Sequence, residues 1–410
     1  MAFMPVSKSL SRSRAGPTAL DLCISAPSIS PETDNAAVLA LFSLHKELPS
    51  LPVVEHRRPF GLINRHLFLS QMSRPFYREL YDKKSCIAFM DKSPLIIDHA
   101  ATLGAVAEQT VITGDKSLSD GFIITREGEY LGIGLGLDLV KMVSDVHEQQ
   151  HQQIVQSIEY ASVIQGAMLA TSRQAMTLAL NDWSLLWQPR DTVGGDYYYF
   201  IQRENGWLMV LVDCTGHGVP GAFMTLIFAS ALNQALSQHG SERPELLLSA
   251  INRHIKETLG QIQQEGQPRP LSNDGCDVMI LALNTLSSTL KWVSARIPAF
   301  ILSAEQGHTQ ALSVDRMGVG YTDTPYDYVW PCEQLTINPQ DIFFTMTDGL
   351  TDQVGGERGI MFGKRRLRDL LQRYQSLPMP ELATNLMAEW QLYQGEEPRR
   401  DDVTFWGFRY

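Results

Sequence analysis

The chain has 410 residues and a formal net charge of −11 at pH 7. This length exceeds what one ordinary hydrophobic core holds, so two or three domains are expected. No strongly basic run stands out against the acidic background, which argues against a surface that binds nucleic acid.

The start of the chain and the cysteines favour a soluble, cytoplasmic protein. Residues 1–20 are predicted to be a flexible tail, because their basic and serine-rich start leads into no long apolar core of a signal peptide. The five cysteines are scattered and show no C-x-x-C spacing, which favours a reducing compartment over a disulfide framework. No stretch is expected to reach the roughly 20 apolar residues of a membrane span, the nearest being residues 208–212. We therefore expect no membrane contact.

Residues 21–146 contain an internal repeat. Its unit is an Asx-capped helix, an apolar strand, a polar turn, an apolar strand with glycine and a second helix. The helix start and the two strands fall at residues 30–38, 51–55 and 60–64 in the first copy, and at residues 96–102, 121–125 and 130–134 in the second. Two copies of one unit predict a pseudo-twofold regulatory module.

The repeat resembles a tandem pair of CBS domains, a family that often binds adenosine nucleotides between its copies. The resemblance implies a hydroxyl residue and then an Asp after the glycine strand. The first copy has Asn64 and Leu67 at these positions, and the second has Leu135 and Asp138. Two interpretations stay open, namely an adenine nucleotide site and a dimerisation or docking module.

Residues 137–178 are predicted to form one long helical linker. Apolar residues recur at three- and four-residue steps. They are Leu139, Val143, Val146, Ile154, Ile158, Ala161, Ile164 and Met168. With the polar interval at residues 148–153, this pattern predicts a parallel coiled coil or switch helix in a homodimer. The alternative is an amphipathic helix that packs on its own domain.

Residues 180–410 alternate strand-like runs with helices. Short connections join the strands in pairs, which predicts two antiparallel sheets with helices outside, an α+β sandwich.

Four acidic turns recur at strand ends, at Asp196, Asp213, Asp348 and Asp401. An oxygen-rich set of this kind suits Mg²⁺ or Mn²⁺. Two such ions can hold a bridging water, lower its pKa and clamp a phosphoryl oxygen, which predicts phosphoester hydrolysis. Taken singly, each turn is more simply a strand-end Asp that caps a turn.

The ordered set resembles the SpoIIE-like branch of the bacterial protein phosphatase 2C family. The resemblance is carried by Gly194-Gly195-Asp196, Asp213-x-x-Gly-His-Gly, Asp274-Gly-x-Asp277, Thr347-Asp348-Gly-Leu-Thr-Asp352 and Asp401-Asp402-Val-Thr. It implies an α-β-β-α sandwich, two Mn²⁺ or Mg²⁺ ions, and catalysis through those four carboxylates.

The same resemblance implies individual roles. Asp213 would bridge both ions, with the backbone carbonyl of Cys214 as a ligand. Asp196, Asp348 and Asp401 would complete the set, with Asp352 and Asp402 as outer supports. Asp277 is a candidate for a third ion or, equally, a turn cap.

Other residues near the acidic turns leave alternatives open. His217 could donate a proton or pack against its turn, and Arg190 is a candidate to bind the phosphate. Tyr199 stands where many relatives have an Asp, which implies a missing support for the metal. Cys214 and Cys276 are interpreted as packing residues rather than a redox pair.

Two functional hypotheses follow. The favoured one is a regulated serine/threonine phosphoprotein phosphatase, whose substrate is a small phosphorylated partner-switching protein of the anti-sigma antagonist type. The alternative is a non-catalytic pseudophosphatase, an adaptor that binds a phosphoprotein or nucleotide. The complete set of four aspartates discriminates in favour of the enzyme.

Overall fold

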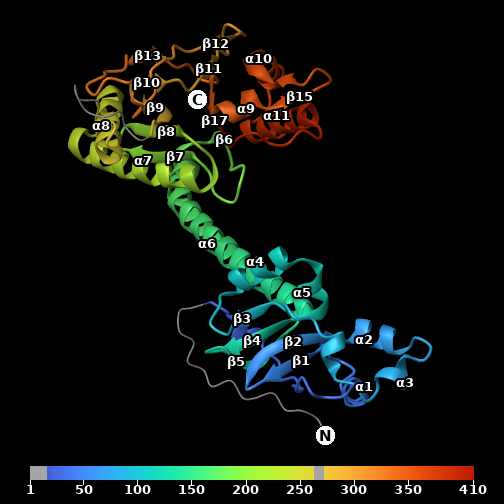
Figure 1. Ribbon diagram of the computed structural model, residues 1–410. Helices are drawn as coiled ribbons and strands as arrows, with labels where there is room; N and C mark the ends of the chain where they lie inside the picture. The colour runs from blue at the N-terminus through green and yellow to red at the C-terminus, as the bar shows by residue number, and fades with distance from the viewer. Residues whose placement is uncertain (1–15, 263–271) are drawn as a thin grey trace. The chain divides into compact units, whose positions relative to one another are not determined.

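The computed structural model describes residues 16–262 and 272–410, and divides them into two compact units that meet at residues 153 and 154 (Figure 1). Most of the predicted N-terminal tail, residues 1–15, lies outside the described residues. The domain limits expected from the sequence, 21–146, 137–178 and 180–410, stay predictions. The boundary between the two compact units falls within one helix, α6 (Gly136–Ala179).

The first unit contains the same order of elements twice. In chain order it holds η1 (Ala19–Leu22), α1 (Asn35–Leu44), β1 (Ser50–Glu55), β2 (Arg58–Asn64), α2 (Arg65–Met72), α3 (Tyr77–Tyr81), η2 (Cys86–Phe89), β3 (Ile96–Asp98), α4 (Leu103–Thr113), α5 (Asp115–Asp120), β4 (Phe122–Arg126) and β5 (Glu129–Gly134). Each copy has a capped helix, then an antiparallel hairpin, β1-β2 or β4-β5, then another helix, and in the second copy α5 is inserted between the capped helix and the hairpin.

Both hairpins turn on two residues with positive φ, His56 and Arg57 in the first and Glu127 and Gly128 in the second. Such turns match the twist of the paired strands. Each hairpin also begins beside a parallel neighbour, Ile29 next to β1 and β3 next to β4. These features describe a repeat; its assignment to the CBS family stays a prediction.

The second unit is a four-layer sandwich, which confirms the predicted architecture of residues 180–410. Its strands form two five-stranded antiparallel sheets, in the orders β13-β10-β9-β8-β7 and β12-β11-β14-β17-β6. The strands are β6 (Asp182–Gln188), β7 (Asp196–Arg203), β8 (Gly206–Cys214), β9 (Cys276–Asn284), β10 (Thr289–Ala295), β11 (Ala299–Leu302), β12 (Thr309–Ala311), β13 (Glu333–Thr336), β14 (Ile342–Met346) and β17 (Val403–Arg409), with a small hairpin of β15 (Val354–Gly355) and β16 (Ile360–Met361).

Helices cover the outer faces of the two sheets. They are α7 (Gly218–His239) and α8 (Pro244–Leu259) on the first sheet, and α10 (Gly363–Tyr374) and α11 (Met379–Gln394) on the second, with the short α9 (Asp348–Asp352) beside them. Because helices lie on one face and the other sheet on the opposite face, central strands such as β8 are apolar on both sides.

One helix corrects the expectation that no stretch approaches a membrane span. By length and composition α7 is apolar enough to cross a membrane, with 44% of its most apolar window buried. Its buried residues, among them Met224, Phe228 and Leu232, belong to the core beside the first sheet. A core helix passes the same test as a membrane helix, so the finding is weak evidence for a span.

Helix α6 has features of both predicted arrangements, a helix that packs on its own domain and a helix that pairs with a second copy. Near its start, Leu139 is buried in the first unit, and near its end Leu169 and Met176 are buried in the second. Between them the side chains of Ile154, Tyr160 and Val163 are 61%, 69% and 67% exposed. The two ends therefore pack on their own units, and the exposed apolar side chains Ile154, Tyr160 and Val163 lie between them.

Candidate active site

Three of the predicted carboxylates lie in one row across the first sheet. Asp196 at the start of β7 pairs with Asp213 on β8, and Asp213 pairs with Asp277 on β9. Residues directly opposite each other on antiparallel strands project from the same face, with Cβ atoms about 5 Å apart. Like charges in such a row repel each other, so a bound cation would relieve the repulsion.

The second sheet brings the remaining carboxylates to this row. Asp348 is the first residue of α9, directly after β14, and Asp401 precedes β17, the neighbour of β14. The hydroxyl of Thr347 donates a hydrogen bond to Asp196 Oδ2 at 2.9 Å and so joins the two sheets. The four predicted catalytic aspartates therefore meet where the two sheets face each other.

Asp402 holds the Gly-Gly-Asp turn in place. Its carboxylate accepts hydrogen bonds from the backbone N–H groups of Arg190, at 2.5 Å, and Gly195, at 2.6 Å. A Cβ atom on Gly195 would lie 2.5 Å from the carbonyl oxygen of Gly216, so only glycine allows this approach. The predicted outer role of Asp402 thus corresponds to fixing the backbone that precedes Asp196.

Burial and like charges raise the pKa of these carboxyls. Burial, with Asp402 and Asp401 nearby, holds the pKa of Asp196 well above its usual value, and burial with Asp196 and Asp348 does the same for Asp213. Burial, then Asp352 and Asp401, raises the pKa of Asp348 to about 6, although its side chain keeps contact with solvent.

Asp277 differs from its neighbours because it has a cationic partner. Arg296 Nη1 lies 3.5 Å from Asp277 Oδ1, and burial outweighs this partner to raise the pKa of Asp277 to about 6. In the described part of the chain, Asp196, Asp213, Asp348, Asp401 and Asp402 make no ion pair. The need for an external cation is therefore greatest around the four principal aspartates.

As the side chains stand, the carboxylates are neighbours without a closed cage. Among residues 16–262 and 272–410, no group of three or more His, Cys, Asp or Glu side chains is arranged to hold a metal ion. The ligand roles predicted for Asp196, Asp213, Cys214, Asp348, Asp401 and Asp277 stay predictions.

Cys214 and Cys276 face each other directly beside this row. The two residues pair across β8 and β9, both are buried free thiols, and their sulfurs lie 3.2 Å apart. Burial, then Cys276, raises the pKa of the Cys214 thiol well above its usual value. A protonated, buried thiol is a packing group, as expected from the sequence.

Arg190, Asp191 and His217 form a polar cluster beside the Gly-Gly-Asp turn. His217 Nδ1 lies 2.9 Å from Asp191 Oδ2, and His217 Nε2 lies 2.8 Å from Arg190 Nη1. A carboxylate can only accept and a guanidinium can only donate, so neutral His217 carries its proton on Nδ1. This arrangement favours a role beyond packing for His217, and it places Arg190 near the start of α7.

The sequence predicted that the helix acts on the Gly-Gly-Asp turn, but not which residue of α6 makes the contact. Gln165 is 5% exposed; its Nε2 donates to the carbonyl oxygen of Gly194 at 2.8 Å, and its Oε1 accepts from the N–H of Gly194 at 3.2 Å. The sequence feature that could have identified Gln165 is a polar residue among the apolar residues of the buried side of the helix. Thr347 was also missed as a link, although it stands directly before Asp348.

Tyr199, where the family resemblance implies a carboxylate, packs against the core of the second unit and contacts none of the four aspartates among the described hydrogen bonds and ion pairs. Tyr321 accepts a hydrogen bond from the Thr215 hydroxyl at 3.2 Å and has the guanidinium of Arg296 over its ring. Tyr321 therefore links the turn after Asp213 to the partner of Asp277.

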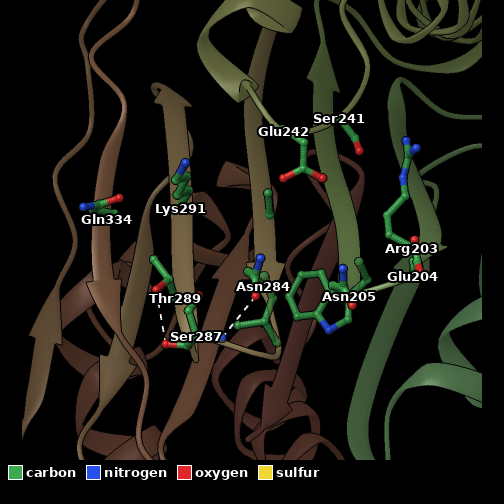
Figure 2. Close-up of a pocket in the computed structure, with 13 residues that line it drawn as sticks. Arg203, Glu204, Asn205, Ser241, Glu242, Asn284, Ser287, Thr289, Lys291 and Gln334 are labelled. Carbon is green, nitrogen blue, oxygen red and sulfur yellow. Dashed lines mark hydrogen bonds between the residues drawn. The ribbon is translucent and has the colours of Figure 1, made fainter.

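A polar cavity of about 600 Å³ lies at the opposite end of the first sheet (Figure 2). Arg203, at the end of β7, and Lys291, on β10, line it together with Glu242 and Asn284. Strand β7 runs from Asp196 to Arg203, so this cavity is separated from the carboxylates by the length of the strand. We therefore place the catalytic site at the other end of the sheet, where the four aspartates lie together.

Comparison with known proteins identifies the second unit. Residues 203–410 match the family model described as Stage II sporulation protein E (SpoIIE), a range that includes all the predicted aspartates except Asp196. The solved SiaA-PP2C domain of Pseudomonas aeruginosa is 32% identical, with a TM-score of 0.56, and the match covers 64% of this chain and 98% of that one. The search of curated proteins gave no match.

Two weaker structural similarities have TM-scores below 0.5. The RsbU and RsbW domains of a Mycobacterium tuberculosis protein are 18% identical, with a TM-score of 0.45, over 56% of this chain and 60% of that one. The PP2C phosphatase domain of SpoIIE from Bacillus subtilis, with a fragment of its regulatory domain, is 15% identical, with a TM-score of 0.43, over 57% and 64%.

The family match spans half of the chain, and the solved domain from Pseudomonas aeruginosa matches almost along its full length. The chain therefore belongs to the SpoIIE family, and its C-terminal unit is a PP2C-type serine/threonine phosphatase.

Proposed function

We propose that the protein is a regulated, metal-dependent phosphatase that removes phosphate from a serine or threonine of a small partner-switching protein. The observation that carries the chemistry is the meeting of Asp196 and Asp213 with Asp348 and Asp401 between the two sheets. The family resemblance supports the substrate class of the anti-sigma antagonist type. The cytoplasm is the compartment where such a partner would be met.

The residues present fit two Mn²⁺ or Mg²⁺ ions, on which PP2C phosphatases depend. Asp196, Asp213, Asp348, Asp401 and the carbonyl of Cys214 would hold them. These carboxylates make no ion pair within the described residues, and burial together with their mutual repulsion raises the pKa of Asp196, Asp213 and Asp348. Bound ions supply a water of lowered pKa and neutralise charge on the phosphoryl group. Asp277 is a weaker candidate for a third ion, because Arg296 already pairs with it.

The side chains around this centre would handle the substrate. Arg190 would leave His217 and the carbonyl of Arg400 to bind a phosphate oxygen, since a guanidinium donates two parallel bonds to such a group. The released Nε2 of His217 could then take up a proton and deliver it to the leaving serine oxygen, while Asp191 fixes the ring through Nδ1.

Regulation would reach the site through α6. Gln165 contacts both backbone polar groups of Gly194, two residues before Asp196. A rotation or shift of this helix would therefore move the Gly-Gly-Asp turn and change how Asp196 is presented. A signal received by the first unit would act through this contact, either as an adenine nucleotide bound by the CBS-like repeat or as docking of a partner.

The homodimer predicted from the linker has a candidate surface on the second unit. On α6, Tyr160, Val163 and Ile164 are 69%, 67% and 45% exposed, and on α7, Phe223 and Leu226 are 63% and 44% exposed. Gln165 and Thr225, which neighbour these residues, lie in hydrogen-bonding contact with each other. Exposed apolar side chains gathered on two neighbouring helices favour association with a second copy.

The catalytic proposal is tested by manganese-dependent phosphate release from a phosphoserine protein. Asp213→Asn should lower kcat at least about 100-fold, because the carboxylate shared by the site is lost. The matched control is Asp327→Asn, whose side chain is 79% exposed and pairs with Arg253. An unchanged rate in Asp213→Asn, with the fold intact by circular dichroism, would disprove the mechanism.

A further inference from the structure

Helix α10 is basic, in contrast to the rest of the chain. Its twelve residues carry five basic side chains and one acidic one, Asp369, whereas the whole chain has a net charge of −11. Four of the five basic residues fall in the run Lys364-Arg365-Arg366-Leu367-Arg368, which corrects the expectation that the chain has no strongly basic run. Leu367, Leu370 and Leu371 are buried against the second sheet's core, so the charges face outward.

Three of these basic side chains have no partner in the described structure. Arg366 donates to the carbonyl oxygens of Met361 and Phe362, and Arg373 pairs with Glu389. Lys364, Arg365 and Arg368 are exposed and make no hydrogen bond or ion pair within residues 16–262 and 272–410. Their three- and four-residue spacing places them on one side of the helix, which we call the basic face.

The basic face begins beside the active site. The backbone N–H of Phe362 donates to the carbonyl of Gln353 at 2.8 Å, and the side chain of Gln353 accepts from the N–H of Arg400 at 3.2 Å. Gln353 is buried and thus ties the start of α10 to the loop that carries Asp401. Figure 1 shows α9, which starts with Asp348, grouped with α10, α11 and β15.

Lys364 is the second residue of α10, so its charge stands close to the contact between Phe362 and Gln353. Basic residues on a surface helix are most often only solvated. Here they are unpaired, they lie in an acidic protein, and they adjoin carboxylates that would repel an acidic substrate, which favours a binding role.

We propose that the basic face binds acidic side chains of the protein substrate that flank its phosphoserine. This inference rests on the proposed function, because it requires a phosphoprotein at the Asp348 side of the site. Complementary charge would speed the encounter and hold the flanking segment, while the four aspartates and their ions act on the phosphate. The bound segment would lie along Lys364, Arg365 and Arg368.

The test compares two phosphoserine peptides of equal length with the full chain and Mn²⁺. One peptide has Asp and Glu around the phosphoserine, and the other has Asn and Gln. At about 0.1 M salt, where charges act over about 10 Å, we expect kcat/KM to be about tenfold higher for the acidic peptide. At about 1 M salt, where the range falls to about 3 Å, the ratio should approach one.

The variant Arg365→Glu/Arg368→Glu should lower this ratio to one or below, while Lys364 is left unchanged. Because the result is a ratio between two substrates of one enzyme, a general loss of activity does not imitate it. The matched control, Arg243→Glu/Arg253→Glu, makes the same change of charge at α8 and should keep the ratio.

A ratio that is unaffected by the α10 substitutions, or equal rates for both peptides in the unaltered protein at low salt, would overturn the proposal. So would a basic face that binds phosphatidylserine vesicles or DNA without preferring the acidic peptide. If neither peptide is hydrolysed although p-nitrophenyl phosphate is, the proposed phosphoprotein substrate is wrong, and that failure is distinct from a failure of the basic face.

Discussion

At the scale of single residues, the acidic motifs and their supports differ in how far the sequence reveals them. Asp213 and Asp348 stand at or just after the end of an apolar strand, and Asp196 and Asp401 stand at or just before the start of one, so all four could be predicted at strand ends from local pattern alone. Gln165 and Thr347 are recognisable only from their partners, Gly194 and Asp196, which lie 29 and 151 residues away in the chain. A local sequence pattern does not show that residues so far apart in the chain are in contact.

Gln165→Ala should raise the Mn²⁺ concentration needed for half-maximal activity and destabilise the fold. The change leaves the N–H and the C=O of Gly194 without their partner, a loss of about 1–3 kcal/mol for a buried polar group. Phosphate release measured over a Mn²⁺ titration, together with chemical denaturation, checks both effects.

The control is Gln152→Ala on the same helix, whose side chain donates a hydrogen bond to the exposed Glu148. Equal Mn²⁺ dependence in the Gln165 and Gln152 variants would show that α6 does not hold the Gly-Gly-Asp turn.

At the scale of elements, periodicity predicted α6 but not what its faces contact. The heptad-like seam includes Leu139 and Met168, which pack on opposite units, and Ile154 and Ile164, which are exposed. Periodicity records only which face is apolar, since burial by the chain itself and burial by a partner leave the same pattern. The apolar composition of α7 is ambiguous for the same reason.

Val163→Asp/Phe223→Asp should convert a dimer into a monomer. Both side chains are more than 60% exposed, so the charges cost the isolated chain little, whereas burying two carboxylates at an interface is costly. Molar mass by light scattering after size-exclusion chromatography checks the result.

The comparison for this variant is Val111→Asp/Ile112→Asp on α4, where the two side chains are 75% and 78% exposed. This pair should leave the mass unchanged. A dimer that persists in Val163→Asp/Phe223→Asp would exclude the α6 and α7 surface.

At the scale of the whole molecule, the carboxylates make stability depend on pH and metal. The pKa of Asp277 and that of Asp348 rise from 3.8 to about 6, so between these values the folded state binds more protons than the unfolded state. Stability from these groups is therefore fully present below pH 3.8 and lost as the pH rises through about 6.

Mn²⁺ should accordingly raise the Tm more at pH 7 than at pH 5, where protons compete for the carboxylates. At 100 times its Kd, an ion that binds only the folded state adds about 2.7 kcal/mol. Thermal unfolding at both pH values, with and without Mn²⁺, measures the difference. In the Asp213→Asn protein, Mn²⁺ should raise the Tm much less. A rise in Tm that is the same at pH 5 and pH 7 would contradict the competition between protons and Mn²⁺.

The order of the second sheet has a consequence for synthesis of the protein. β6 is the first strand of that sheet in the chain, yet its partner is β17, which begins more than two hundred residues later. During synthesis of β7 to β14, β6 has no strand with which to pair. Domains generally fold as units from the N-terminus, so the first unit can fold during this time. Pairings over such separations form slowly, so the nascent phosphatase unit exposes an open strand edge that a chaperone would need to shield until β17 arrives.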